Sequence, residues 1–241
     1  MEVAIQANNT TDRNPNVSVV IPAYNEESRI TTVLTKYCEY FPNEEIIIVC
    51  NGCVDRTPEI AEQMSHTYSQ LKVLVFEEKI GKGGAVIEGF KVAHGSKIGF
   101  VDADESVEPE DLAKMFDVLS TVDGVLASRR LKDSVILVKQ PWIRRAGSKF
   151  FNIIIRFIFW FNFKDTQCGA KVFSQRAIRD VLNSLNTTGF EFDVELIWKV
   201  KKAGYKIIEY PIVWKHSEGS TFNVNNAPKM VFSLLMVRLR G

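Results

Sequence analysis

The feature that most constrains the fold is an alternation of short apolar runs with helical patterns in the first part of the chain. Apolar runs that end in polar clusters lie at 17–22, 45–49, 71–76 and 98–101. Each of the first three precedes a segment with helical periodicity. Strands that alternate with helices form right-handed crossover units, which give a mostly parallel central sheet with helices on both faces. We therefore predict a Rossmann-like α/β fold.

The rest of the chain continues the α/β pattern with less regular segments. The expected elements are helices at 85–94 and 188–202, strands at 125–128 and 206–214, and helices over 146–162 and 227–240. Pro211 falls within the last strand and therefore requires an edge or a bulge. Because we find no internal repeat, low-complexity tract or linker, we treat residues 17–241 as one domain and residues 1–16 as a loose N-terminal extension.

Composition excludes some classes of protein. The chain has 241 residues, of which 46% are hydrophobic, enough for a sizeable core without disulfides. The 30 Lys and Arg residues balance 29 Asp and Glu residues, so global attraction to nucleic acid is not indicated. Four cysteines are too few for a disulfide framework and favour a reducing compartment. Cys50 and Cys53 could form a redox pair or half of a zinc site, but further zinc ligands are not obvious.

The clearest chemical signal is the triplet Asp102-Ala103-Asp104, which directly follows an apolar strand. Two carboxylates at a strand exit can hold a hard divalent cation, Mn²⁺ or Mg²⁺, which would neutralise a diphosphate. Ligands of parallel α/β sheets bind at the carboxyl ends of the strands. Further polar clusters surround Asn25, Asp55 and Lys82, and they fall at the same ends. We therefore expect one ligand site along this edge.

Five motifs, in this order, carry a resemblance to a known family: 19–27 (VVIPAYNEE), 81–85 (GKGGA), 102–104 (DAD), 165–173 (DTQCGAKVF) and 192–196 (FDVEL). The first three resemble glycosyltransferase family 2 with the GT-A fold. The last two are similar to the branch of dolichyl-phosphate hexosyltransferases, which includes glucosyltransferases and mannose synthases. The resemblance spans about residues 17–222. It implies a metal-dependent inverting transfer of a hexose from a nucleotide-diphospho-sugar to a dolichyl or other polyprenyl phosphate.

The resemblance also implies roles for individual residues at the donor site. The positions that would contact the nucleotide sugar are Pro22, Tyr24, Asn25, Glu26, Asn51, Asp55, Lys82, Asp102 and Ala103, and the metal ligands would be Asp102 and Asp104. Where the family often has two aspartates before glycine and serine, this chain has Cys50-Asn51-Gly52-Cys53. Asn51 both donates and accepts hydrogen bonds, so we expect base recognition with an altered preference.

On the acceptor side, similarity to the mannose synthases implies that Arg129, Arg144 and Ser148 bind the acceptor phosphate. Guanidinium groups suit phosphate geometry, and the alternative is that these arginines are ordinary solvated surface residues. Asp193 is expected near the reacting centre. A phosphate acceptor needs little proton abstraction, so Asp193 would orient the sugar or acceptor, whereas with a hydroxyl acceptor it would be the general base. The predicted catalytic residues are thus Asp102, Asp104, Asp193 and Arg129.

The helix expected over 146–162 has a polar stripe and a wide arc of aromatic and aliphatic residues. Such an arc is either buried in the core or lies among lipid headgroups, and the helix is too short to span roughly 30 Å of bilayer. We favour an interfacial helix, because a polyprenyl acceptor requires an apolar landing surface. The helix over 227–240 repeats the pattern. The predicted location is peripheral, on the cytoplasmic face of a membrane.

The sequence therefore predicts a glycosyltransferase that uses one in-line displacement to form a β-linked lipid-phosphate hexose. UDP-glucose is favoured as donor over GDP-mannose. One alternative is a family 2 transferase with a hydroxyl acceptor and Asp193 as its base. Another alternative, of a different class, is a non-catalytic nucleotide-binding or membrane scaffold protein.

Overall fold

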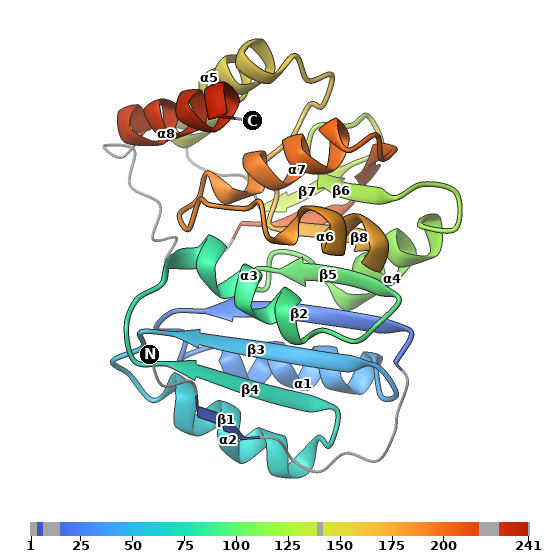
Figure 1. Cartoon of the computed structure of the whole chain (residues 1–241). Coiled ribbons are helices and arrows are strands. Elements are labelled where there is room, and N and C mark those ends of the chain that lie inside the picture. The colour runs from blue at the N-terminus through green and yellow to red at the C-terminus, as the bar shows by residue number, and fades with distance from the viewer. Residues whose placement is uncertain (1–3, 7–14, 139–141, 217–226, 241) are drawn as a thin grey trace.

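The computed structural model describes residues 4–6, 15–138, 142–216 and 227–240; within them it describes no side chains for 4–6, 142–146, 148–150, 227–229 and 240. Its centre is an eight-stranded sheet (Figure 1). In spatial order the strands are β1 (Ala4–Gln6), β4 (Leu71–Phe76), β3 (Glu45–Asn51), β2 (Val17–Ala23), β5 (Lys97–Val101), β8 (Ala170–Ser174), β6 (Gly124–Ser128) and β9 (Ile207–Pro211). Strands β4, β3, β2 and β5 are parallel, and β8 lies antiparallel between β5 and β6.

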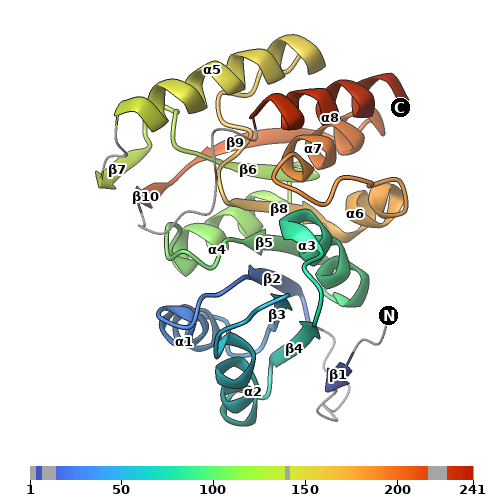
Figure 2. The ribbon, with the colours of Figure 1, turned by 90° about the vertical axis from the view of Figure 1, so that its left-hand side faces the viewer.

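Helices cover both faces of this sheet, as predicted (Figure 2). One face carries α1 (Ile30–Tyr40), α2 (Thr57–Thr67) and α4 (Pro109–Val118), and the other carries α3 (Gly81–Val92), α6 (Gln175–Leu182) and α7 (Phe192–Lys202). Side chains of β3 alternate between the two cores: Ile47 and Val49 contribute to one, Ile46 and Ile48 to the other. Every residue of β3 is buried, which explains its continuous run of β-branched residues.

Two helices lie side by side beyond β9, α5 (Trp142–Phe159) and α8 (Ala227–Arg240) (Figure 1). Helix α5 buries Phe151, Ile155 and Phe159 and exposes Phe157 and other apolar side chains. Among the described residues, no helix has the length and apolar character required to cross a membrane. A second, two-stranded parallel sheet joins β7 (Val135–Val138) to β10 (Val213–Lys215).

The observed boundaries differ from the predicted ones where tertiary contacts intervene. The strand expected at 206–214 is divided into β9 and β10, and Pro211 ends β9 at the edge of the sheet, as its missing N–H requires. Helix α5 begins and ends earlier than expected, and Trp160 follows it with a left-handed φ of 55°. The N-terminal extension, expected to be loose, contributes β1, which pairs antiparallel with β4.

A buried carboxylate ties together the amino-terminal edge of the sheet. Glu45, only 5% exposed, begins β3. It accepts hydrogen bonds from the Ser18 hydroxyl (2.5 Å), the Lys72 ammonium (2.5 Å) and the His94 backbone N–H (2.8 Å). Burial by itself would raise the pKa of Glu45, but Lys72 and these hydrogen bonds outweigh it and hold the pKa below 4.5. The charged carboxylate therefore stabilises the junction of β2, β3, β4 and the end of α3.

Replacing this carboxylate should make folding stability less sensitive to acid. A carboxylate with a lowered folded-state pKa stabilises the protein above its unfolded pKa, and this contribution disappears as pH falls through the folded value. We expect Glu45→Gln to lower the free energy of unfolding by about 2 kcal/mol at pH 7. The difference from wild type should shrink as pH falls below about 4.5.

Urea unfolding from pH 7 to pH 3 measures this effect, with the exposed Glu59→Gln as a matched control. A difference between Glu45→Gln and wild type that stayed constant over the whole pH range would contradict the assignment.

Candidate active site

The predicted site residues gather where the strand order reverses. Strand β2 lies between β3 and β5, so the chain leaves β2 towards one side of the sheet and returns on the other. Ligands of open α/β sheets bind in the crevice at such a point. The segment after β2 carries Glu26, β3 ends at Asn51, and Asp102 directly follows β5. The fold thus gathers these side chains on one edge, as the strand pattern predicts.

Asp102 is held tightly against the strand beside it. Its backbone N–H donates to the Gly169 carbonyl (2.9 Å), which extends the pairing of β5 with β8. A Cβ atom added to Gly169 would collide with Oδ2 of Asp102. A side chain at 169 would therefore have to displace the Asp102 carboxylate.

The loop after Asp102 is shaped by its own side chains. Asp104 accepts a hydrogen bond from the Ser106 backbone N–H (3.0 Å), and Glu105 has a left-handed φ of 57°. The Glu105 carboxylate pairs with Lys36 at 3.6 Å, so it is already engaged by a cation of the protein. The loop thus offers two carboxylates, those of Asp102 and Asp104, for a cation.

A chain of alternating charges runs inward from Asp102. The Lys82 ammonium lies 2.7 Å from Oδ1 of Asp102 and 3.4 Å from Oδ2 of Asp193. The other oxygen of Asp193 accepts from Lys171 at 2.5 Å, and the Lys171 ammonium also donates to the Cys168 carbonyl (2.8 Å). Lys171 is fully buried and Asp193 is 2% exposed. Each charge in this array is offset by a neighbour of opposite sign, as burial demands.

Burial and neighbouring charges shift the pKa values of Asp193, Asp102 and the nearby Glu26. Burial would raise the pKa of Asp193, but Lys171 and Lys82 outweigh it and hold this pKa below the ordinary value. Burial raises the pKa of Asp102, and the opposing charge of Lys82 only partly offsets the rise. Burial, opposed by Arg29 and reinforced by the charges of Asp104 and Asp102, raises the pKa of Glu26 to about 7. Burial is thus the main cause of the raised pKa of both Asp102 and Glu26.

The glycine-rich segment 81–84 is the first turn of α3 rather than a loop before it, so the predicted helix start at residue 85 is wrong. The Asn51 side-chain oxygen accepts from the N–H groups of Ile80 (2.7 Å) and Gly81 (3.2 Å). The Thr188 carbonyl accepts from Gly83 (2.8 Å) and Gly84 (3.3 Å). These acceptors satisfy the free N–H groups of the first turn. The glycines thus serve close packing, and Lys82 projects from a capped helix.

The same capping explains a second boundary error. Residues 188–191, expected in a helix with 192–202, instead form the loop whose Thr188 carbonyl caps α3, and α7 begins at Phe192. A Cβ atom added to Gly83 would lie 2.5 Å from the Phe192 Cβ. The close approach of α3 and α7 brings Lys82 to Asp193.

Several predicted nucleotide contacts also hold the loops in place. Asn25, with a left-handed φ of 56°, accepts from the Val54 N–H (2.9 Å). Asp55 accepts from the Glu27 N–H (3.0 Å) and from the hydroxyl of Thr57 (2.6 Å) at the start of α2. These bonds join the loops after β2 and β3.

The other residues predicted to contact the nucleotide sugar lie in or directly after the strands. Pro22 lies within β2, and Ala103, between Asp102 and Asp104 in the sequence, is buried. Tyr24 follows β2, and the Lys79 ammonium lies 3.6 Å from its ring centroid. This contact places a positive charge beside the expected nucleotide site.

Arg129 is paired rather than free. It follows β6, and its Nε and Nη2 atoms donate to the two oxygens of Asp165 at 2.7 and 2.9 Å. Burial would raise the pKa of Asp165, but Arg129 outweighs it and holds the pKa below the ordinary value. The guanidinium also lies 5.3 Å from the ring centroid of Trp214. Nη1 is not part of the pairing with Asp165. Arg144 and Ser148 occupy α5, but their side chains lie outside the described residues.

The structure contributes residues that the sequence analysis did not single out. Lys171 and Asp165 were quoted only within a motif, although a lysine inside an apolar strand is itself a signal, because fully buried lysines are almost always paired. Lys79 carried no sequence signal. The pair Cys50 and Cys53 are free thiols, and the described part of the chain has no cluster of three or more His, Cys, Asp or Glu residues able to hold a metal ion. The zinc interpretation is therefore unsupported.

Comparison with known proteins shows the family to which the chain belongs. The sequence model described as Glycosyl transferase family 2 matches residues 18–182. The chain belongs to this family. The dolichyl-phosphate beta-glucosyltransferase of Saccharomyces cerevisiae is 32% identical and aligns over 92% of this chain and 74% of its own length. The human protein of that name is 27% identical over 85% of this chain and 68% of its own.

Solved structures confirm the GT-A fold of this family 2 chain. Glucosyl-3-phosphoglycerate synthase from Mycobacterium tuberculosis, in complex with Mn²⁺, UDP-glucose and phosphoglyceric acid, has a TM-score of 0.69 and 18% identity, covering 93% of this chain and 79% of that one. The mannosyltransferase PcManGT from Pyrobaculum calidifontis, with GDP-mannose and Mn²⁺, has a TM-score of 0.61 and 19% identity, covering 87% and 59%. Membership of family 2 and the dolichyl-phosphate beta-glucosyltransferase relatives make the chain a glycosyltransferase, which excludes the scaffold alternative.

Glycosyl transfer should be sensitive to a single methyl group added at Gly169. We expect Gly169→Ala to reduce glycosyl transfer about a hundredfold, because the new Cβ displaces the Asp102 carboxylate. Transfer of radiolabelled sugar from a nucleotide sugar to a lipid phosphate measures the loss.

Gly147→Ala is the matched control, since its added Cβ meets nothing within 4 Å. Circular dichroism should show that both proteins are folded. Equal activity of the Gly169→Ala and Gly147→Ala proteins would then show that glycosyl transfer does not depend on the position of the Asp102 carboxylate.

Proposed function

We propose that this glycosyltransferase moves glucose from UDP-glucose to dolichyl phosphate or a similar polyprenyl phosphate, with inversion to a β-linked product. The observation that carries the proposal is the charge array from Asp102 through Lys82 and Asp193 to Lys171 at the strand ends. It offers anionic ligands for a cation and a buried cation close to them. The two relatives compared above bear the name of this reaction, which supports glucose as the sugar and dolichyl phosphate as the acceptor.

Asp102 and Asp104 fit a divalent cation, Mn²⁺ or Mg²⁺. Both are hard oxygen donors at a strand exit. A cation held there would offset the charge of the leaving nucleoside diphosphate. Two protein carboxylates are enough for such an ion when the phosphates of the donor complete its coordination.

Lys82 and Asp193 would position the sugar. Lys82 is fixed between two carboxylates, so its ammonium is held at one point. This point would lie near the phosphates of the sugar donor. Asp193 has both oxygens paired with lysines and a lowered pKa, which makes it a weak base. This pairing disfavours the alternative with a hydroxyl acceptor, for which Asp193 would have to remove a proton. An ionised phosphate acceptor requires no such step.

Arg129 would bind the acceptor phosphate through the part of its guanidinium that Asp165 leaves uncommitted. Asp165 orients the group with two parallel hydrogen bonds, and the ring of Trp214 lies close to it. Such an arrangement holds a fork of donors at a fixed position. Arg144 and Ser148, four residues apart on α5, remain proposed partners for the same phosphate.

The face formed by α5 and α8 would bind a membrane surface. On α5 the exposed apolar side chains are Ile153 (61%), Phe157 (84%) and Trp160, just beyond its end (83%). On α8, Phe232 (66%) and Leu239 (79%) are exposed. Exposed apolar side chains on neighbouring helices are typical of an interfacial surface. The four free thiols suit a reducing compartment, so we place this surface on the cytoplasmic face.

The metal proposal is tested with Asp104→Ala. We expect transfer to fall by a factor of about 10³ or more, because the diphosphate charge is no longer offset. Wild-type activity should be lost in EDTA and restored by Mn²⁺ or Mg²⁺. The control is Asp117→Ala, an exposed carboxylate on α4. Near wild-type turnover of Asp104→Ala would refute the metal assignment, and faster transfer from GDP-mannose than from UDP-glucose would refute the donor assignment.

The membrane proposal is tested by cosedimentation with phospholipid vesicles. Phe157→Gln should weaken binding about tenfold or more, because a large apolar side chain no longer leaves water. Val54→Gln is the control, since Val54 is similarly exposed (89%) but lies between β3 and α2, and Figure 1 shows α2 at the other end of the molecule from α5. The surface is assigned wrongly if both variants bind vesicles as wild type does.

A further inference from the structure

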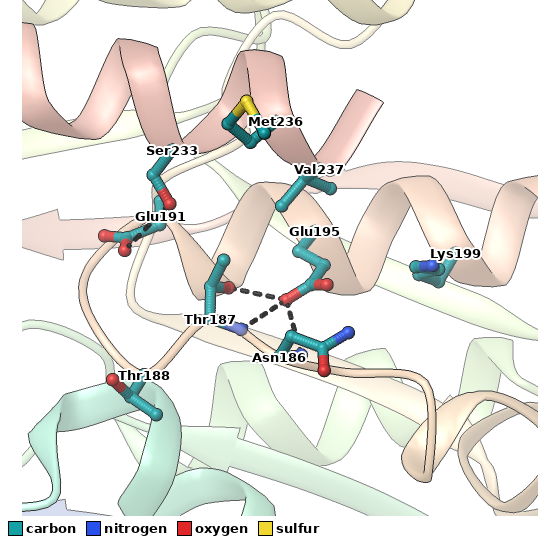
Figure 3. A pocket seen from close by; sticks show the side chains of 9 residues that line it. All are labelled: Asn186, Thr187, Thr188, Glu191, Glu195, Lys199, Ser233, Met236 and Val237. Carbon is teal, nitrogen blue, oxygen red and sulfur yellow. Dashed lines mark hydrogen bonds between the residues drawn. The ribbon is translucent and has the colours of Figure 1, made fainter. Parts of the chain in front are cut away.

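A cavity separate from the charge array lies between α7, α8 and the loop that precedes α7 (Figure 3). Its volume is about 200 Å³, well above the roughly 10–15 Å³ that one water molecule requires. Residues from three segments line it: Asn186, Thr187, Thr188, Glu191, Glu195, Lys199, Ser233, Met236 and Val237. The cavity is therefore large enough for a small organic molecule.

Glu195 is the unusual residue of this cavity, because its carboxylate is fully buried. One oxygen, Oε2, accepts three hydrogen bonds, from the N–H groups of Asn186 (3.0 Å) and Thr187 (2.7 Å) and from the Thr187 hydroxyl (2.6 Å). The other oxygen, Oε1, has no hydrogen-bond partner and is the one such buried side-chain atom in the described residues. A buried acceptor without a donor is costly, so Oε1 is the atom of this cavity at which a hydrogen-bond donor would be most stabilising.

The charge around Glu195 indicates which ligand. A second carboxylate, that of Glu191, lines the cavity and accepts from the Ser233 hydroxyl (3.4 Å). The cation that lines the cavity, Lys199, has its ammonium 5.2 Å from the ring centroid of Trp198 and makes no bond to Oε1 of Glu195. Buried carboxylates are normally paired with a cation. The occupant should therefore be positively charged and should donate hydrogen bonds.

We propose that this cavity binds the ammonium group of a small primary amine, with Oε1 of Glu195 as its principal acceptor. Glu191 adds negative charge, and Met236 and Val237 give the carbon chain an apolar wall. A metal ion is disfavoured, because only two carboxylates are among the residues that line the cavity and no substrate phosphate is proposed there to complete its coordination. The proposal concerns binding and does not depend on which sugar or acceptor the enzyme uses.

Such an amine has two possible sources with the same chemistry, a free amine such as ethanolamine and the ethanolamine headgroup of a phospholipid. The cavity lies on the inner side of α8, whose opposite side exposes Phe232 and Leu239. The loop that lines the cavity also caps α3 through the Thr188 carbonyl. An occupant would therefore brace the segment that positions Lys82.

Thermal unfolding of the purified chain tests the proposal. Ethanolamine hydrochloride should raise the unfolding temperature in a saturable manner, whereas choline chloride at equal ionic strength should not, because its nitrogen has no N–H donor. Glu195→Gln should weaken ethanolamine binding about ten- to a hundredfold, as expected for a lost hydrogen bond to a charged group. Glu59→Gln, exposed on α2, is the matched control.

Glu195→Gln should fold, because the amide oxygen can keep the three donors of Oε2 and the buried charge disappears. Ser233→Leu is a second variant, which fills the cavity and leaves the carboxylate intact, and it should also abolish the shift. Stabilisation of wild type by phosphatidylethanolamine vesicles but not by phosphatidylcholine vesicles, without an effect of free ethanolamine, would identify the lipid headgroup as the source. The proposal is overturned if neither probe acts, or if Glu195→Gln and Ser233→Leu respond as wild type does.

Discussion

The arrangement of this molecule depends on one largely buried network of opposite charges. Lys82 and Lys171 share the carboxylate of Asp193, and Lys82 also reaches Asp102. These residues come from α3, β8, α7 and the end of β5, so the network exists only when all four elements are packed. Removing one member would leave an uncompensated charge in the interior, which is far more costly than losing a surface ion pair. The same contacts therefore fix the positions of these side chains and balance their charges at the strand ends.

Four carboxylates of this protein differ in how completely protein groups pair with their oxygens. Glu45 at the amino ends of the strands is fully engaged by protein donors and serves the fold. Asp102 and Asp104 at the carboxyl ends are engaged on one side only and remain partly exposed. Glu195 is intermediate, because one of its oxygens is saturated and the other has no donor. Incomplete satisfaction, rather than acidity, distinguishes the carboxylates with which a ligand can interact.

Much of the site could be anticipated because it follows strands. Asp102 and Glu26 are adjacent in space because parallel strands bring their carboxyl ends to one edge, and the apolar runs reveal those strands. The errors occurred where distant segments supply hydrogen bonds. Helix α3 starts before residue 85 because Asn51 and Thr188 cap it, and residues 188–191 are not helical for the same reason. Local sequence does not contain such acceptors.

The sequence alone determined the α/β class, the order of the motifs and the family to which they belong, because strand and helix periodicity and short motifs are local properties of a chain. Only the tertiary structure decided that Asp165 orients Arg129, that Lys171 neutralises Asp193, and that Glu195 faces a cavity. These pairings join residues between 8 and 36 positions apart. A contact of that kind is set by how whole elements pack, and nothing in the local pattern specifies it.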